Sequence, residues 1–291
     1  MGKEIIMIGA IIGDMVGSPY ELNTILEVDD PTWQPLFHPT LSKFTDDTVL
    51  TIATADAIMN LEGNDTYRGF STLAFKDKYK EYALKYPNRG YGGTFWAWAN
   101  QDTDVINRSY ANGCMMRCSP IGIYWWDKLH KALDVAKDSI AWTHNSPESL
   151  RGISSIVSAI CMGFQGKTKP EIKAFVEEQF GQWLDASVQT VRETWDKRNI
   201  RCNITCAQSL ICFLNSVDYE TAIRLAVYSQ GDCDTIAAIA GSMAEAFYGP
   251  QSIPRWMIDE AKKRLQPEMI ETINTFYKLP QCQNHYDGFV I

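Results

Sequence analysis

The sequence predicts an all-α protein, a compact single-domain orthogonal bundle of helices that spans residues 1–291. Apolar residues recur at helical spacing along most of the chain, whereas the alternating pattern of β-strands is nearly absent. The sequence has no internal repeat and no convincing domain linker. With 291 residues, of which 45% are hydrophobic and 21% charged, the chain is long enough to bury a large core.

The first predicted helix, residues 5–16, is apolar almost throughout. Its small residues Gly9, Ala10 and Gly13 would let another helix approach closely. The run has a single lysine before it, no small-residue cleavage site and Asp14 inside it, which argues against a signal peptide. It is also too short and interrupted to span a bilayer. We therefore expect a buried helix, no membrane association and a cytoplasmic protein.

Two long loops are expected between the helices. Residues 23–43 contain three prolines and no steady period, and residues 101–119 are polar. A long loop inside a compact domain is usually functional or mobile. The remaining predicted helices, which are followed by a tail, are residues 48–59, 67–86, 94–99, one beginning at residue 120, 129–142, 148–164, 171–184, 187–196, 205–214, 219–228, 235–247 and 255–265.

Composition narrows the possible classes of protein. The formal net charge of −8 is spread along the chain, which argues against binding to duplex nucleic acid. The eight cysteines lie in apolar, helix-like contexts, so buried and reduced thiols are expected rather than disulfides. Cys114/Cys118 and Cys202/Cys206 have the spacing of half a zinc site, but no matching histidine or second pair stands near either in the sequence.

Two short acidic segments are the main candidates for chemistry. Residues 44–48 (FTDDT) and residues 231–235 (GDCDT) each place two carboxylates and a hydroxyl directly before an apolar, alanine-rich helix. One acid per helix N-terminus is explained by capping and by the helix dipole. Two close acids repel each other unless something positive lies between them. A hard cation such as Mg²⁺, Mn²⁺ or Ca²⁺ suits these oxygen ligands better than zinc, so capping and metal binding both remain open.

Other features are weak when each is taken alone. Glu21 follows a Gly-Ser-Pro turn, where an ordinary exposed acid is also expected. Asn112-Gly113 with Arg117 could hold an anion through backbone N–H groups, but plain turns look the same. Residues 90–93 form a glycine turn of a common kind. His144 stands at a helix start, and a lone histidine is more often a structural residue than a ligand.

In combination, and in this order along the chain, these segments resemble the ADP-ribosylglycohydrolase family, the relatives of dinitrogenase-reductase-activating glycohydrolase. Each segment alone is weak, whereas six in sequence order are specific. The matching segments are residues 9–21, 44–48, 90–93, 112–122, 143–148 and 231–237.

The resemblance implies an all-α fold with a two-metal site at helix N-termini, holding two Mg²⁺ or Mn²⁺ ions. It implies metal ligands at Thr45, Asp46, Asp47, Asp232, Asp234 and Thr235, and catalytic roles for Glu21, Asp47 and Asp232. It implies that the substrate diphosphate is held by Ser109, Tyr110, Ala111, Asn112 and Gly113. It implies that His144 lies beside the distal ribose or adenine of the substrate, and that Gly92 also binds substrate.

The sequence departs from the family pattern at three positions near these motifs. Ala111 replaces a glycine, which could tighten the diphosphate loop. Gln230 stands where a glycine is common, and Cys233 replaces a small polar residue between two proposed ligands. All six oxygen ligands remain, which indicates an active enzyme.

The activity implied by the resemblance is metal-dependent hydrolysis of the glycosidic bond between ADP-ribose and its acceptor. The expected partner is an ADP-ribosylated protein or a small-molecule ADP-ribose conjugate, and we expect a monomer. Two alternatives are hydrolysis of an O-acyl-ADP-ribose and a protein that binds ADP-ribose without cutting it. Acidic clusters without metal would repel a diphosphate, so strong metal dependence is expected.

Overall fold

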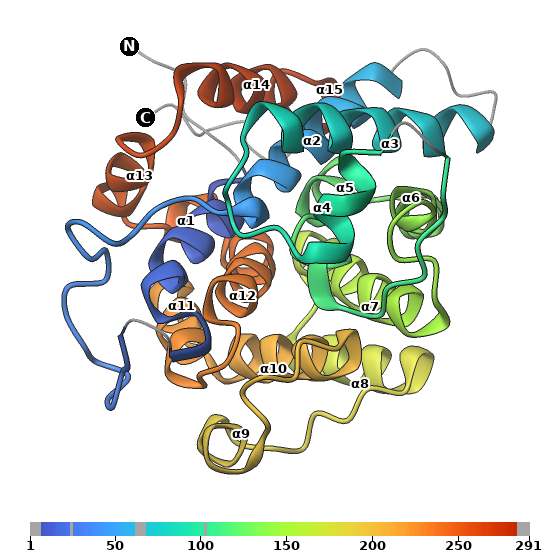
Figure 1. The fold of residues 1–291 in the computed structure, drawn as a ribbon. Coiled ribbons are helices and arrows are strands. Elements are labelled where there is room, and N and C mark those ends of the chain that lie inside the picture. The colour runs from blue at the N-terminus through green and yellow to red at the C-terminus, as the bar shows by residue number, and fades with distance from the viewer. Residues whose placement is uncertain (1–6, 24–25, 62–67, 102–103, 284–291) are drawn as a thin grey trace.

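The structure, a computed structural model, describes residues 7–23, 26–61, 68–101 and 104–283, and it is all-α as predicted (Figure 1). Within these residues the regular elements are helices, accompanied by two isolated β-bridges. The α-helices are α1 Ile8–Gly17, α2 Asp46–Leu61, α3 Arg68–Lys85, α4 Gly93–Ala99, α5 Ser119–Tyr124, α6 Leu129–Ile140, α7 Pro147–Phe164, α8 Lys169–Phe180, α9 Val188–Thr194, α10 Cys202–Asn215, α11 Tyr219–Tyr228, α12 Cys233–Tyr248, α13 Arg255–Lys262, α14 Pro267–Tyr277 and α15 Pro280–Gln283. Three short 3₁₀-helices are η1 Ser18–Asn23, η2 Asn112–Cys114 and η3 Pro250–Ser252.

Helices α1 and α12 are packed backbone to backbone at the centre of the fold (Figure 1). A Cβ atom added to Gly13 would lie 2.2 Å from the carbonyl oxygen of Ala237, and one added to Gly17 would lie 2.4 Å from that of Cys233. The small residues of α1 therefore allow close helix packing, as the sequence predicted. Every residue of α1 is buried, including Asp14.

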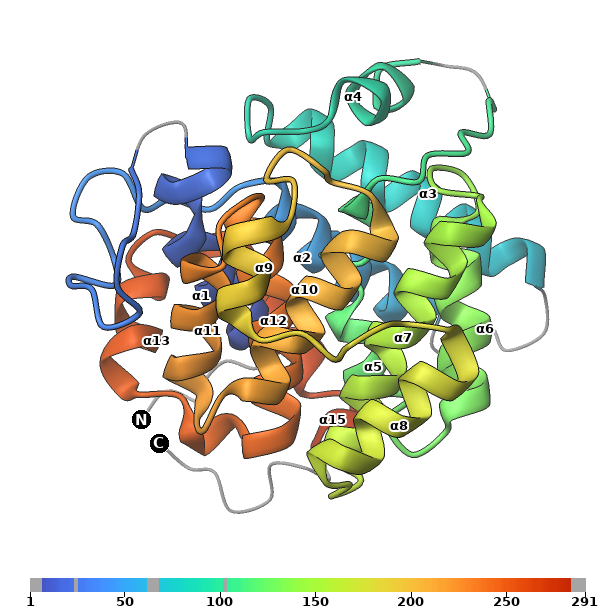
Figure 2. The ribbon, with the colours of Figure 1, turned by 90° about the horizontal axis from the view of Figure 1, so that it is seen from below.

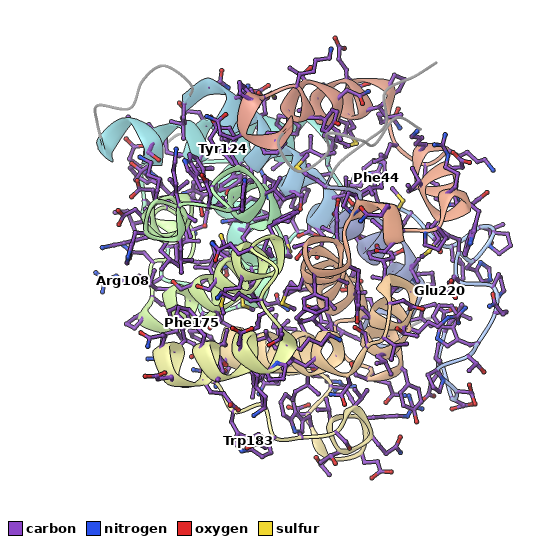
Figure 3. All side chains as sticks on the ribbon, turned by 180° about the vertical axis from the view of Figure 1, so that it is seen from behind. Phe44, Arg108, Tyr124, Phe175, Trp183 and Glu220 are labelled. Carbon is purple, nitrogen blue, oxygen red and sulfur yellow. The ribbon has the colours of Figure 1, made fainter. Side chains whose placement is uncertain are left out.

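The other helices are arranged around this pair. Helix α12 also packs against α11, α7 and α10, and α2 packs against α3 and α14. Seen from below, α10 lies between α9 and α7 and packs against both (Figure 2). Side chains fill the space between the helices, while Trp183, which is 57% exposed, lies at the periphery (Figure 3). No helix among the described residues is long and apolar enough to cross a membrane.

Local sequence signals explain where several helices begin. The hydroxyl of Ser146 accepts a hydrogen bond from the Ser149 N–H at the start of α7, and Pro147 occupies the first helical position. Asp218 caps α11 in the same way, accepting from the Thr221 N–H at 2.7 Å. These caps satisfy backbone donors that have no partner inside the helix.

The largest departures from the predicted helices are one helix end and the last segment of the chain, while other predicted ends differ by three residues or fewer. The helix predicted for residues 171–184 ends at Phe180, because Gly181 adopts a left-handed φ of 66° and closes α8. The segment after residue 265, predicted to be a tail, contains α14 and α15. Helix α14 could have been found, because Met269, Ile273 and Phe276 recur at helical spacing and are buried. The start predicted for the first helix, residues 5–6, lies outside the described residues.

The loop predicted for residues 23–43 is confirmed where it is described. It is tied to the helices by contact between the rings of Tyr20 and Trp33, which are tilted by 52° and whose centroids are 4.9 Å apart. The guanidinium of Arg224 on α11 donates to the Trp33 carbonyl at 2.6 Å. These contacts hold the loop that precedes the first acidic segment against η1 and α11.

All eight cysteines are buried and carry free thiols, as predicted for residues in apolar helix contexts. Another buried polar group, Glu245 of α12, accepts a hydrogen bond from the Gly9 N–H at the start of α1 at 2.9 Å. Burial raises the pKa of Glu245 from its usual 4.5 to about 7.

We expect Gly13→Ala to destabilise the fold by about 1–3 kcal/mol or more, because the added methyl group meets backbone atoms of α12 that cannot move aside easily. Gly93→Ala is the control, since a Cβ at Gly93 meets no atom within 4 Å. Urea unfolding measures both variants. Equal stability of the two would contradict the close α1–α12 contact.

We expect Glu245→Gln to flatten part of the dependence of stability on pH. Because the folded pKa is raised, the folded state holds the proton more tightly, and stability from this group is lost as pH rises from about 4.5 to about 7. Across that window the variant should gain about 3 kcal/mol of unfolding free energy relative to the wild type. Exposed Glu178→Gln should follow the wild-type curve. If the unfolding free energies of Glu245→Gln and the wild type changed with pH in parallel, the pKa of Glu245 would not be raised in the folded protein.

Candidate metal centre and active site

The two acidic segments meet at the N-termini of α2 and α12, as predicted. Asp46 and Asp47 occupy the first turn of α2, and Asp234 occupies the first turn of α12, with Asp232 at its N-cap. The hydroxyl of Thr235 donates to Asp47 Oδ2 at 3.4 Å, a contact between residues 188 positions apart. The fold therefore brings both segments into one cluster.

The cluster opens onto a cavity of about 380 Å³. The cavity is lined by most of the residues expected from the sequence, namely Glu21, Asp46, Asp47, Gly92, Ser109, Ala111, Asn112, Gly113, His144, Asp232, Asp234 and Thr235. Asp46 and Asp234 thus face the same space although they begin different helices.

Two expected site residues, Thr45 and Tyr110, are placed differently. Thr45 is buried behind the cavity, where its hydroxyl lies 2.7 Å from Asp14 Oδ1 and 3.3 Å from Asp47 Oδ2. The Tyr110 side chain is 53% exposed and stacks on the Arg201 guanidinium, 4.4 Å from the ring centroid. The loop containing Tyr110 borders the cavity, but its aromatic ring points to solvent.

Asp14 is a site residue that the sequence reasoning did not single out. Its carboxylate accepts hydrogen bonds from the backbone N–H groups of Thr45 and Thr48, at 2.9 and 3.1 Å, and from both threonine hydroxyls. Asp14 therefore caps α2 from another helix. The signal was one acid inside an otherwise apolar helix, because a fully buried carboxylate needs such partners.

Glu21 is held at the cluster by a kinked backbone. Leu22 adopts a left-handed φ of 50°, and its N–H donates to the Gly231 carbonyl at 2.6 Å. Gln230, beside Gly231, also has a positive φ of 63°, which explains why a glycine would suit this position. The carboxylate oxygens of Glu21, Asp232 and Asp234 come within 4.8 Å of one another.

The cluster is electrostatically crowded. Burial, with repulsion from neighbouring carboxylates added, raises the pKa of Asp46, Asp47 and Asp234 well above the usual value. Burial and then Asp232 also raise the pKa of Glu21, against a smaller opposing effect of Lys43. Negative charge in this cavity is therefore costly unless a cation or a proton accompanies it.

The donor set fits divalent cations. Asp47 Oδ1 is buried and has no hydrogen-bond partner within the described residues, so it offers a lone pair. A second group of close carboxylates joins Asp14, Asp47 and Asp234, so Asp234 belongs to both groups. Because Asp14 already accepts four hydrogen bonds, the other carboxylates are the better ligands. Oxygen ligands alone suit Mg²⁺ or Mn²⁺.

The loop expected to hold a diphosphate is anchored to the acidic cluster. The side-chain amide of Asn112 donates to Asp232 Oδ2 at 2.6 Å and to the Thr205 hydroxyl at 3.2 Å. The Asn112 N–H also donates to the Ile200 carbonyl at 2.9 Å. The position of the loop is thus tied to a proposed metal ligand.

His144 is buried against the same loop. A Cβ added to Gly113 would lie 3.3 Å from His144 Nε2, so a side chain at position 113 would crowd the ring. Burial, and then the nearby Arg117 charge, hold the pKa of His144 well below its usual range. His144 is therefore neutral at physiological pH.

Comparison with known proteins agrees with this arrangement. A family model described as ADP-ribosylglycohydrolase matches residues 6–284. The chain belongs to the ADP-ribosylglycohydrolase family. This membership confirms the resemblance inferred from the six segments, and it supports hydrolase activity toward ADP-ribosyl compounds.

Similar ADP-ribosylglycohydrolase family members cover most of the chain. ADP-ribosylhydrolase ARH3 of Mus musculus is 23% identical over 84% of this chain and 83% of its own length. ADP-ribosylarginine hydrolase Tri1 of Pseudomonas putida is 23% identical over 85% of this chain and 71% of its own. A solved structure described as an ADP-ribosylglycohydrolase-related protein complex has a TM-score of 0.67 and 23% identity, covering 94% of this chain and 95% of the other, which shows the same fold.

For this family member we expect Asp47→Asn to be more stable than the wild type without metal and less stable than the wild type with metal. In metal-free buffer the variant should melt at a higher temperature than the wild type, because one buried negative charge is removed. With Mg²⁺ at 100 times its Kd, the wild type should gain about 2.7 kcal/mol and the variant much less. Asp56→Asn, on the same helix but paired with Lys78, should keep the metal response. If Mg²⁺ stabilised Asp47→Asn as much as it stabilises the wild type, Asp47 would not be a metal ligand.

Proposed function

We propose that this chain is a metal-dependent hydrolase that cleaves the glycosidic bond between ADP-ribose and its acceptor. The proposal is carried by the Asp47–Thr235 contact, which unites two acidic segments in one cavity together with Glu21. Family membership and the names of the relatives supply the substrate class. The reduced state expected of eight buried thiols suits a cytoplasmic protein, and we propose a monomer.

The proposed ligands of two Mg²⁺ or Mn²⁺ ions are Asp46, Asp47, Asp232, Asp234 and Thr235, which line the cavity, and Thr45, whose hydroxyl lies 3.3 Å from Asp47 Oδ2. Bound there, the ions would supply Lewis acidity and would hold the vicinal hydroxyls of the ribose. Asp14 keeps Thr45 and the first turn of α2 in place through its four hydrogen bonds.

Glu21 is the proposed catalytic carboxylate. Burial and the nearby Asp232 raise its pKa above the usual value, so it holds a proton more readily than an ordinary glutamate and can act as a general base toward water or a general acid toward the leaving group. Breaking the bond at the sugar carbon also generates positive charge on the ribose, which a carboxylate stabilises. The kink at Leu22 and its hydrogen bond to Gly231 keep Glu21 beside Asp232.

The rest of the substrate would lie along the loop of residues 109–113. The Ser109 hydroxyl on this loop would be a donor for diphosphate oxygens, whereas the N–H groups of Ala111 and Asn112 already donate to the Ser109 hydroxyl and the Ile200 carbonyl. Asn112 keeps the loop close to the carboxylates, so diphosphate and ribose would be held by one connected unit. His144 lines the same cavity, on the side of Gly113.

We expect the purified protein to release free ADP-ribose from an ADP-ribosylated substrate when Mg²⁺ is present and to stop when EDTA is added. Asp46→Ala and Asp234→Ala should each lower turnover by about three orders of magnitude or more. Asp56→Asn, outside the cavity, should remain active. Activity that survives complete chelation would refute the metal role.

The same assay identifies the acceptor if arginine-linked protein, serine-linked protein and O-acyl-ADP-ribose are compared side by side. Turnover of the acyl ester alone would favour hydrolysis of a small conjugate. Tight ADP-ribose binding without turnover of any of the three would favour a binding protein. The arginine-linked substrate is included because the Pseudomonas putida relative is named for it.

A further inference from the structure

Arg117 is a buried cation that the proposed chemistry does not use. Only 1% of its surface is exposed, and its guanidinium lies 4.1 Å from the ring centroid of Tyr79. Among the described residues that line the cavity it is the one arginine or lysine. Its Nε and Nη1 have no hydrogen-bond partner in the described part of the chain, and Nη2 donates to the Thr143 hydroxyl at 2.7 Å.

The Thr143 hydroxyl connects Arg117 to His144. Thr143 Oγ1 lies 2.9 Å from His144 Nδ1, and all three side chains are buried. A guanidinium can only donate, so Thr143 Oγ1 is the acceptor in its contact with Arg117. The hydroxyl proton then needs an acceptor of its own, and His144 Nδ1 is the one within reach among the described residues.

This chain of hydrogen bonds determines where His144 carries its proton. If Nδ1 were protonated, two donors would face one oxygen and the buried Thr143 hydroxyl proton would have no acceptor, which is unfavourable. Nδ1 is therefore the acceptor, and the proton of the neutral ring is on Nε2. Burial and the Arg117 charge, which lower the pKa of His144, keep the ring from taking a second proton.

The protonated nitrogen faces the loop expected to bind diphosphate. His144 Nε2 is the atom nearest to a Cβ built on Gly113, at 3.3 Å, and it makes no hydrogen bond within the described residues. Thr143, His144 and Gly113 line the same cavity. Nε2–H is thus a donor without a protein partner beside the ligand space.

We propose that Arg117 is a positioning residue that acts through Thr143 to fix His144 as the neutral Nε2–H tautomer, so that His144 offers a hydrogen bond to an oxygen or nitrogen acceptor of the ligand. That the ligand is ADP-ribose rests on the proposed function. The tautomer itself is a property of the free protein. The assignment makes this part of the cavity selective for groups that accept hydrogen bonds.

Nitrogen-15 NMR of the imidazole rings in the ligand-free protein tests the tautomer directly. The chain has four histidines, and the His144 signals are those missing from His144→Gln. The wild type should show a protonated Nε2 and an unprotonated Nδ1. Thr143→Val should lose this bias and populate both tautomers, whereas Thr143→Ser, which keeps the hydroxyl, should retain it. A protonated Nδ1 in the wild type, or an unchanged ring in Thr143→Val, would overturn the proposal.

Arg117→Met separates the role of the guanidinium from that of the hydroxyl. It removes the donor but keeps an apolar side chain against Tyr79. Like Thr143→Val, it should populate both tautomers of His144. If this variant fails to fold, the Thr143 pair decides the question. A folded Arg117→Met protein with the wild-type tautomer would show that Arg117 only fills space.

Calorimetric titration with ADP-ribose in Mg²⁺ tests the effect on the ligand. Affinity should fall about tenfold in Thr143→Val, as expected for one mispositioned buried hydrogen bond, and stay near wild type in Thr143→Ser. Equal affinity in the two variants would refute the donor role. If the wild type does not bind ADP-ribose, the proposed function fails, and the NMR spectra alone then decide the tautomer assignment.

Discussion

The backbone contact between α1 and α12 is the packing contact around which the acid-bearing elements of the cavity are arranged. Glycine at position 13 lets the two helices approach until a methyl group would overlap a carbonyl of α12. At this separation the Asp14 carboxylate accepts hydrogen bonds from backbone N–H groups at the start of α2. The 3₁₀-helix η1, which contains Glu21, packs against α12. Three elements that carry acids are thus located by one packing contact, and close packing makes that location rigid.

The same region departs from the local rules that the rest of the chain follows. Carboxylates are buried together, and Leu22 and Gln230 adopt left-handed conformations that non-glycine residues rarely hold. Such departures concentrate at functional sites, where surrounding structure maintains them. Here the surroundings are the apolar faces of α1, α2 and α12, which are buried almost completely.

Much of this architecture could be predicted from sequence, because periodicity reports which residues face a core and acidic segments before apolar helices report helix starts. The role of Asp14 could not, because its partners lie 31 and 34 positions away and one acid in an apolar helix does not specify them. The outward turn of Tyr110 depends on stacking with Arg201, a contact with no local signal. Tertiary pairing of polar groups is therefore the part that sequence patterns leave undetermined.

The loop of residues 109–113 is linked to the acidic cluster by the side-chain amide of Asn112. Asn112 Nδ2 has two protons, and its bonds to Asp232 and Thr205 use both, so the side chain has one orientation. That orientation fixes the backbone of residues 111–113 against the carboxylate whose proposed partner is a cation. A loop held in this way cannot shift without disturbing Asp232. The distance between the proposed diphosphate and ribose subsites would thus be set by the fold, and different acceptors would be distinguished by residues beyond the ribose.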